Sequence, residues 1–450
     1  MPSKIYPFTL ARTSIDLIPR KMAWVNQHSF SQSIKPLLWC LKIAGLLPGI
    51  PLLGGGNTDS DNNEISPARV RIRSCSGRVY TVYSIVVILI LWYNLALSLT
   101  AFVSVTQFNG IVCNQIITSM WFLQIAYCAV CNFFVCKHLK VFCVQFDDVA
   151  KSINFTNYYF IRKCAIGATV LYVIWMLIAF TFTGLGSYFL AAGNVGGPFG
   201  EVSFGVGIIV RIAFLVTYFY FTSTWYLIVA SFFVVSLVLT KKFRHFNRNF
   251  KKCFEDGKFK GDIETTRMQH EHMSRLLFQA DKVFSMYVMS SIGTVIPLII
   301  FTLYFLLFES IDVFSFIATL WSACLSIIQM MVVFLGGGFV NHEAHAALEH
   351  VYGIDMNVMG PVHCHQLNVF LSKLTANQIG FTAFGLFTID KPTIIAVSTY
   401  RSCHFGLFTI DKPTTIAFAS SIVTYTVVVI QFKPSASDAT SSLCNCTLTT

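Results

Sequence analysis

Long apolar runs separated by short polar connections dominate the chain from residue 82 onward. A helix needs about 20 mainly apolar residues to cross the hydrocarbon core of a bilayer. Six runs satisfy this length and a seventh, shorter one lies near the C-terminus. They span residues 82–105, 111–136, 164–188, 205–240, 283–308, 313–340 and 415–432. The pattern predicts an all-α membrane protein with seven transmembrane helices.

The composition agrees with a membrane protein and argues against other classes. Of the 450 residues, 55% are hydrophobic and only 12% are charged, whereas soluble proteins carry roughly 25% charged residues. The polar surface is therefore too small to cover a soluble enzyme of this size. The net charge of +11 could suggest nucleic-acid binding, but basic patches of that kind lie on soluble domains. We therefore expect no nucleic-acid partner.

The positive charges fall on one side of the predicted spans. All but two of the 32 lysines and arginines lie before the first run or in the connections after the second, fourth and sixth runs. The others are Arg211, inside the fourth run, and Lys433, after the last. Because positive residues are retained in the cytoplasm, the N-terminus should be cytoplasmic and the C-terminus extracellular. A G-protein-coupled receptor has the opposite orientation.

The predicted cytoplasmic parts are long enough to fold. Residues 1–78 form an N-terminal region, in which the apolar segment 37–53 should lie at the membrane interface because Pro48 and Pro51 interrupt a helix. Charged and apolar residues alternate between the fourth and fifth runs, so both helices should continue beyond the bilayer. Residues 341–374 should also be helical and complete a packed intracellular bundle, with solvated loops as the alternative interpretation.

The C-terminal region contains an internal repeat. Residues 384–393 and 405–414 both read FGLFTIDKPT, at an offset of 21 residues. Identity over ten varied residues does not arise by chance, and two copies are too few for a repeat architecture. The pattern indicates a local tandem duplication, either a duplicated exon end or an error in the gene model.

The last run has one small, polar helical face, which suits close helix packing or a wall wetted by water and ions. This face comprises Ala417, Ser420, Ser421, Thr424, Val428 and Gln431. The run also contains Thr-Tyr at 424–425, five mostly apolar residues, and Gln-Phe at 431–432. This TYhhhhhQF pattern resembles the signature of insect gustatory receptors. An ordinary stripe facing a helix bundle is the alternative interpretation.

Two further segments extend the resemblance. FTAFGLFTID at 381–390 is similar to the junction before the last helix of that family, and LKIAGLLPG at 41–49 is similar to its N-terminal region. The resemblance implies a ligand-gated cation channel in the plasma membrane of chemosensory neurons. It would be a tetramer, homomeric or heteromeric, surrounded by lipid and opened by a small-molecule tastant, with no cofactor. Residues 79–340 would bind the ligand, and residues 341–414 would form an anchor region.

The resemblance also assigns the pore to the last run, 415–432, followed by an extracellular tail at 433–450. The residues that would form or support the gate are Thr424, Tyr425, Val428, Gln431 and Phe432. The last two would sit at the gate, and the first two would support helix packing and opening. Sugar receptors of the family tend to carry an acidic residue after the Thr-Tyr pair. Thr426 at this position favours a bitter or other non-sugar tastant, with a sugar as the alternative.

The two copies of the repeat differ in their register with the last run. The tyrosine of the family signature lies fourteen residues after the aspartate of FTID. Asp411 and Tyr425 have this spacing, whereas fourteen residues after Asp390 stands His404. The second copy therefore leads in register into the last helix. About 21 residues are inserted, and we expect them to loop out at the cytoplasmic membrane boundary.

Polar and aromatic residues in the outer halves of the spans are candidate ligand contacts, because pockets are mostly apolar with a few orienting polar groups. These candidates are Asn114, Gln115, Trp121, Thr181, Tyr188, Arg211, Tyr218, Glu309, Asp312 and Trp321. Arg211 could meet an anionic or hydroxylated ligand or extend to lipid headgroups. Glu309 and Asp312 could instead attract cations to the pore mouth.

Other functions have weaker support. A secondary transporter should show internal symmetry and buried charges near the midplane, and Arg211 is the one intramembrane charge. The charge distribution argues against a G-protein-coupled receptor. A membrane enzyme with a zinc site would depend on histidines such as His342 and His345, whose HEAH sequence is one residue short of H-E-x-x-H. Cys128 and Cys131 form C-x-x-C inside the second run, where redox chemistry is not expected.

Overall fold

The computed structural model describes most of the chain between residues 29 and 389. The predicted seventh span, 415–432, with its gate residues and tail, lies outside the described residues. The described residues are 29–48, 67–100, 102–103, 110–155, 157–192, 204–255, 258–259, 262–308, 313–352, 361–376, 379–386 and 388–389.

Six long helices form the body of the molecule, and each contains most or all of one of the first six apolar runs. All six are long and apolar enough to cross a membrane. The predicted all-α, multi-span fold is therefore confirmed. The helices are α3 (Pro67–Thr100), α4 (Gly110–Ser152), α5 (Tyr158–Ala192), α6 (Phe204–Lys252), α7 (Ile263–Phe308) and α8 (Val313–His345). Between α6 and α7, β1 (Phe254–Glu255) and β2 (Lys258–Phe259) form a short antiparallel pair.

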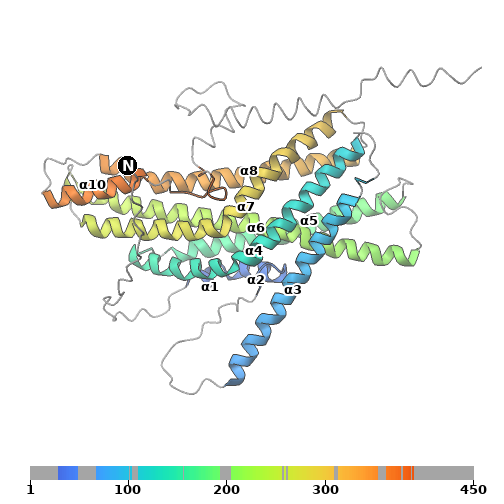
Figure 1. Ribbon diagram of the computed structural model, residues 1–450, viewed down its shortest axis with the longest axis horizontal. Coiled ribbons are helices and arrows are strands. Elements are labelled where there is room, and N and C mark those ends of the chain that lie inside the picture. Colours follow the sequence, from blue (N-terminus) through green and yellow to red (C-terminus); the bar gives the residue numbers. More distant parts are fainter. Residues whose placement is uncertain are drawn as a thin grey trace, which may run out of the picture.

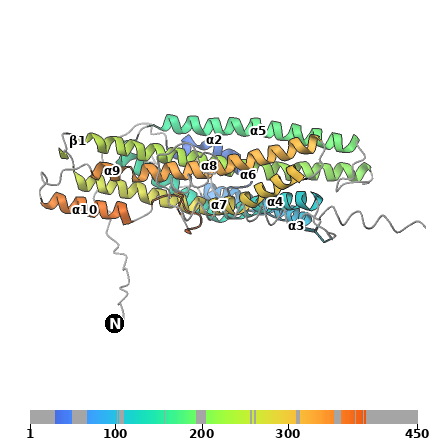
Figure 2. The same ribbon diagram turned by 90° about the horizontal axis from the view of Figure 1, so that it is seen from above.

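Several of these helices are much longer than a bilayer is thick. The 49 residues of α6 correspond to about 70 Å at about 1.5 Å per residue, more than twice the roughly 30 Å of a hydrocarbon core. α4, α6, α7 and α8 run side by side along the long axis of the molecule, while α3 crosses them at an angle (Figure 1). Figure 2 shows α9 (Ala347–Tyr352) and α10 (Pro361–Ala376) at one end of this elongated body.

We call this end the distal bundle. It comprises the C-terminal parts of α4, α6 and α8, the N-terminal part of α7, and α9 and α10. Its core is aromatic: the ring centroids of Phe250 and Phe370 lie 6.2 Å apart, and those of His270 and Phe370 lie 5.5 Å apart. His270 is buried, and its Nε2 atom lies within hydrogen-bond distance, 3.2 Å, of the carbonyl oxygen of Ala344. The end of α8 is thereby fixed to the start of α7.

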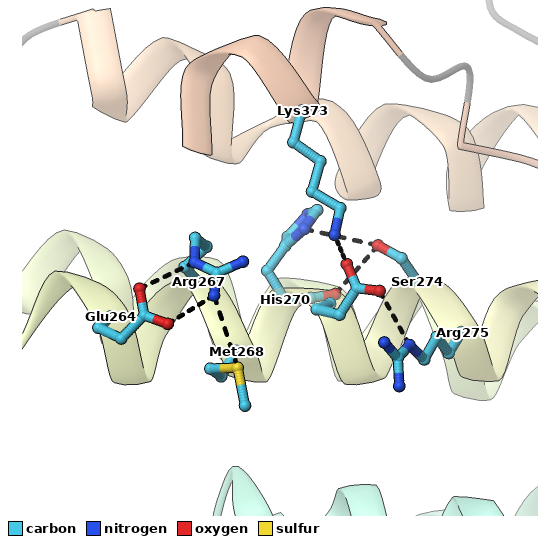
Figure 3. Close-up of polar contacts among 8 residues, drawn as sticks. Glu264, Arg267, Met268, His270, Ser274, Arg275 and Lys373 are labelled. Atoms are coloured by element: carbon cyan, nitrogen blue, oxygen red, sulfur yellow. Dashed lines mark hydrogen bonds and ion pairs between the residues drawn. The ribbon is translucent and has the colours of Figure 1, made fainter. Parts of the chain in front are cut away.

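Charged side chains join α10 to α7 at the surface of the distal bundle. Lys373 extends from α10 towards α7, where Arg267, His270 and Arg275 lie (Figure 3). The Lys373 ammonium pairs with Glu271, and Glu271 also accepts a 2.8 Å bond from Arg275 Nε. Partial burial, together with the Arg267 charge, lowers the pKa of Lys373. One carboxylate thus holds two cations from two helices.

Residues 37–43 of the segment predicted to lie at the membrane interface belong to α2 (Lys35–Ile43), which follows the single-turn α1 (Phe30–Ser33). Residues 49–53 of that segment lie outside the described residues. Leu37 on α2 is buried, whereas Trp39 is 46% exposed. α2 packs on α5 and α6, so one face joins the core and the other presents an apolar ring outward. This amphipathic arrangement suits an interfacial helix.

The first long helix ends earlier than its apolar run. α3 stops at Thr100, whereas the run continues to residue 105. Thr100 donates its hydroxyl to the Leu97 carbonyl at 2.7 Å, and the N–H groups of Phe102 and Val103 bond to carbonyls three residues back. Such tight turns are typical of a helix end. Residues 104 and 105, where the predicted run ends, lie outside the described residues.

Candidate functional site

A cavity of about 710 Å³ lies between four of the long helices, at the end of the body remote from the distal bundle. Its walls come from the N-terminal halves of α4, α6 and α8 and from the second half of α5. Ligand pockets for small molecules have volumes of about 300–1,000 Å³. The cavity is therefore large enough for a small organic molecule, and its four walls belong to helices that meet only in the folded chain.

Tryptophans dominate the cavity wall. Four of the chain's seven tryptophans line it. The rings of Trp175 and Trp321 stack at 5.7 Å with 15° between their planes, and Trp175 also lies 5.7 Å from Trp225. Trp121 meets Trp225 edge to face at 5.9 Å. These contacts join α4, α5, α6 and α8 into one aromatic wall with flat apolar faces.

Hydrogen bonds behind the wall fix the tryptophans in place. Trp225 donates its indole N–H to Gln329 Oε1 at 2.7 Å, and the amide of the fully buried Gln329 donates to Ser291 at 2.9 Å. Trp121 donates to the Ser322 hydroxyl at 3.0 Å. Buried polar groups with satisfied partners rigidify a core. The cavity shape is therefore held by bonds that join α6, α7 and α8, and α4 to α8.

The polar groups of the cavity wall are neutral. They are hydroxyl, amide and phenol side chains, and none of the described lining residues carries a charge: Asn114, Thr118, Thr217, Tyr218, Thr222, Thr319 and Ser322. A charged ligand would thus find no opposite charge among these residues. The wall instead suits an uncharged, mostly apolar molecule with one or two groups able to accept or donate a hydrogen bond.

The structure places the predicted ligand contacts in three groups. Those that line the cavity are Asn114, Trp121, Tyr218 and Trp321. Gln115 and Thr181 are described but do not line it: Gln115 donates to the Ser98 carbonyl at 2.6 Å, and Thr181 to the Leu177 carbonyl at 2.8 Å. Those outside the described side chains are Tyr188, Arg211, Glu309 and Asp312. The predicted gate residues are Thr424, Tyr425, Val428, Gln431 and Phe432, and they lie outside the described residues.

Sequence reasoning missed important parts of the wall, above all Trp175 and Trp225 together with Phe221. These residues lie nearer the middle of their apolar runs than the predicted contacts, and an aromatic residue in a membrane span is usually read as ordinary packing. The available signal was the distribution of tryptophan, a rare residue that occurs once in each of the second, third, fourth and sixth runs.

The histidine-rich region around the end of α8 forms ordinary contacts. Glu343 pairs with Arg244 at 2.6 Å, and His345 Nε2 accepts the backbone N–H of Ile379 at 3.2 Å. Among the described residues, no group of three or more histidine, cysteine, aspartate or glutamate side chains is placed to hold a metal ion.

The long-helix body with a cavity at one end has known relatives. A family model described as 7tm Chemosensory receptor matches residues 34–400. The chain belongs to this family. This family is a family of receptors and not of enzymes. Its membership and the six long apolar helices indicate a multi-pass membrane protein. The matched range contains α2 to α10 and the first copy of the repeat, and it ends before the second copy and the last apolar run.

Solved structures show the same fold. The insect olfactory receptor OR5 from Machilis hrabei in complex with eugenol superposes on this receptor with a TM-score of 0.63 and 13% identity, covering 88% of this chain and 97% of that one. The structure of the same olfactory receptor without a named ligand gives a TM-score of 0.60 at 14% identity, with the same coverage. No curated protein matches the sequence. The resemblance to insect chemoreceptors that was inferred from sequence motifs is confirmed.

Proposed function

We propose that this receptor is a gustatory receptor that acts as a tastant-gated, non-selective cation channel. The observation that carries the proposal is the cavity walled by tryptophans from four helices. A ligand shifts a conformational equilibrium only when it binds one state better than another. A molecule that fills this cavity touches α4, α5, α6 and α8 together, so its affinity depends on how these helices are arranged.

The ligand should be an uncharged, ring-containing organic molecule. Flat indole faces favour planar rings through offset or edge-to-face contacts, and the neutral polar side chains of the wall can orient one or two polar groups. The related olfactory receptor OR5 was solved in complex with eugenol, which is consistent with this class. A sugar carries many hydroxyls that this mainly aromatic wall would leave unpaired, so a bitter or other non-sugar tastant is favoured.

The proposed channel has a cytoplasmic N-terminus and lies in the plasma membrane of chemosensory neurons. It assembles as a homomeric or heteromeric tetramer around a pore lined by residues 415–432, with Gln431 and Phe432 at the gate and Thr424, Tyr425 and Val428 supporting it. Rings of apolar side chains can close such a pore by dewetting. The distal bundle and the rest of residues 341–414 would serve as the anchor. Support comes from the charge distribution and the last-run signature.

Current recording from cells that express the full chain tests the proposal. A panel of neutral aromatic compounds, sugars and quaternary ammonium compounds should be applied with G-protein signalling intact and blocked. We expect cation-selective current evoked by neutral aromatic compounds and unaffected by the block. Currents that disappear under the block would indicate a G-protein-coupled mechanism and contradict the channel. A response to sugars alone would contradict the ligand class while leaving the channel standing.

A further inference from the structure

After α10, the described residues 379–386 and 388–389 fold back on themselves in a compact hairpin. Thr382 and Thr388 form an antiparallel bridge, and the Ile389 N–H bonds to the Phe381 carbonyl at 2.8 Å. The turn contains Gly385 with φ of +76°, a backbone conformation that glycine adopts without steric cost. This hairpin contains the start of the first repeat copy, residues 384–393, preceded by Phe381, Thr382 and Ala383.

The hairpin is bound by one carboxylate of α7. Asp281 accepts the backbone N–H of Thr382 at 2.7 Å with Oδ1 and the Thr382 hydroxyl at 2.8 Å with Oδ2. The same hydroxyl oxygen accepts the Gly385 N–H at 3.0 Å. Hydrogen bonds to a carboxylate are about twice as strong as those between neutral groups. Thr382 therefore links the fold of the hairpin to its attachment on α7.

Apolar contacts complete the attachment. The Phe381 ring is fully buried with its centroid 5.0 Å from that of Phe232, and Ala383 and Ile389 are also fully buried. Ile389 packs directly on Gly337 of α8, where an added Cβ would come within 2.9 Å of it. Gly337 thus makes room for the hairpin.

Two bonds hold the start of the hairpin to the end of α8. The Asn341 side-chain amide donates to the Ile379 carbonyl at 3.0 Å, and the Ile379 N–H bonds to His345 Nε2 at 3.2 Å. Together, Asp281, Phe232, Gly337, Asn341 and His345 form a surface that we call the hairpin dock. It binds the backbone and side chains of one short segment of this chain.

The two repeat copies are identical, but the three residues that precede each copy differ, and those before the first copy are buried in the dock or bonded to it. At the offset of 21 residues, the counterparts of Phe381, Thr382 and Ala383 are serine 402, cysteine 403 and histidine 404. Serine has no ring to fill the space beside Phe232. A thiol is a weaker donor to a carboxylate than a hydroxyl. An imidazole is larger and more polar than the methyl group it would replace at a fully buried position.

We propose that the hairpin dock binds the first copy of the repeat and excludes the second. The copy that is in register with the last apolar run is then not the copy attached to the helical body. The 21 duplicated residues lie between the dock and residues 415–432, and the attachment of the last run to α7 and α8 is lengthened accordingly. This proposal depends on the dock alone and stands whether or not the chain is a channel.

Thermal unfolding of the detergent-solubilised full-length chain tests the proposal with matched variants. Thr382→Val removes the hydroxyl just before the first copy, and Cys403→Val is the equivalent change just before the second. We expect Thr382→Val to lower Tm by roughly a few degrees and Cys403→Val to leave it unchanged. Asp281→Asn should also lower Tm. The double variant Asp281→Asn/Thr382→Val should lower Tm by scarcely more than either single variant, because both changes break the same hydrogen bond.

An exchange of the two triplets provides the converse test. The variant F381S/T382C/A383H/S402F/C403T/H404A moves the preferred triplet to the second copy. In this background Asp281→Asn should still lower Tm, because the second copy now occupies the dock. The proposal would be overturned if, in the unmodified chain, Thr382→Val and Cys403→Val lowered Tm equally or if only Cys403→Val lowered it. These point variants decide the matter even if the exchanged chain does not fold.

Discussion

Trp225 of α6 donates its indole N–H to Gln329 of α8 across 2.7 Å, directly behind the wall of the ligand cavity. Gln329 is fully buried, and its amide nitrogen donates a hydrogen bond to the hydroxyl of Ser291 on α7. Three of the six long helices, α6, α7 and α8, therefore meet at one amide. The cavity wall and the packing of the body depend on the same side chain.

Removing this amide should destabilise the receptor. Gln329→Ala leaves the buried N–H of Trp225 without an acceptor, which costs about 1–3 kcal/mol, and it opens a small void. We expect a lower Tm and a weaker response to ligand. Gln269→Ala is the control, because Gln269 donates a solvent-exposed bond to the Ser152 carbonyl. If both variants lower Tm equally, the proposed role of Gln329 is wrong.

The tryptophan wall should set ligand affinity. We expect Trp175→Ala and Trp321→Ala each to raise the half-maximal concentration of an aromatic agonist roughly tenfold, which corresponds to about 1.4 kcal/mol. Trp92→Ala is the matched control, since Trp92 is 41% exposed on α3 and is not part of the wall. Surface expression should be measured in parallel. If Trp92→Ala raised the half-maximal agonist concentration as much as the wall variants do, the cavity would not be the ligand site.

Removal of one repeat copy should restore the family spacing. Deleting residues 391–411 joins Asp390 directly to residue 412 and places Tyr425 fourteen residues after it. We expect larger ligand-evoked currents at equal surface expression, because the last run is then attached closely to the docked hairpin. Replacing the same residues by a glycine-serine linker of equal length is the control and should not restore current. Equal currents from the deletion variant and the linker variant would show that spacing does not matter.

The orientation of the chain can be tested by glycosylation. Asn154 stands in an Asn-Phe-Thr sequon and is exposed after the end of α4, in a connection predicted to be cytoplasmic. We expect no glycan there. Gly196→Thr creates a sequon at Asn194, in a connection predicted to be extracellular, and this variant should gain a glycan-dependent mass increase. A glycan on Asn154 would reverse the proposed topology.

Asp147 should anchor the N-terminal segment. Its carboxylate accepts the Phe30 N–H at 2.8 Å and the Tyr158 hydroxyl at 3.1 Å. Asp147→Ala leaves both donors without this acceptor, at a cost of about 1–3 kcal/mol for each one that stays buried. We expect a lower Tm and faster proteolysis before α1. The adjacent Asp148 is exposed, so Asp148→Ala should change neither measurement.

The sequence predicted the fold class, the six long apolar helices and the family correctly. Long apolar runs are local signals that a bilayer makes unambiguous, because a spanning helix must satisfy its own backbone. Four predicted ligand contacts, including Trp121 and Trp321, do line the cavity. Gln115 and Thr181 have the same residue chemistry and the same predicted depth, yet their side chains bond to backbone carbonyls elsewhere. Depth along a helix is readable from sequence, but the direction in which a side chain points is not.

By itself, the sequence determined that this protein is a multi-span chemosensory receptor carrying a duplicated segment. Only the tertiary structure decided which residues form the cavity and which surface holds the hairpin. Trp175 and Trp225 lie 50 residues apart in the chain and 5.7 Å apart in space, and Asp281 meets Thr382 across 101 positions. Both pairings depend on which helix faces come into contact. Packing selects those faces, and hydrophobic periodicity along one helix contains no information about its neighbour.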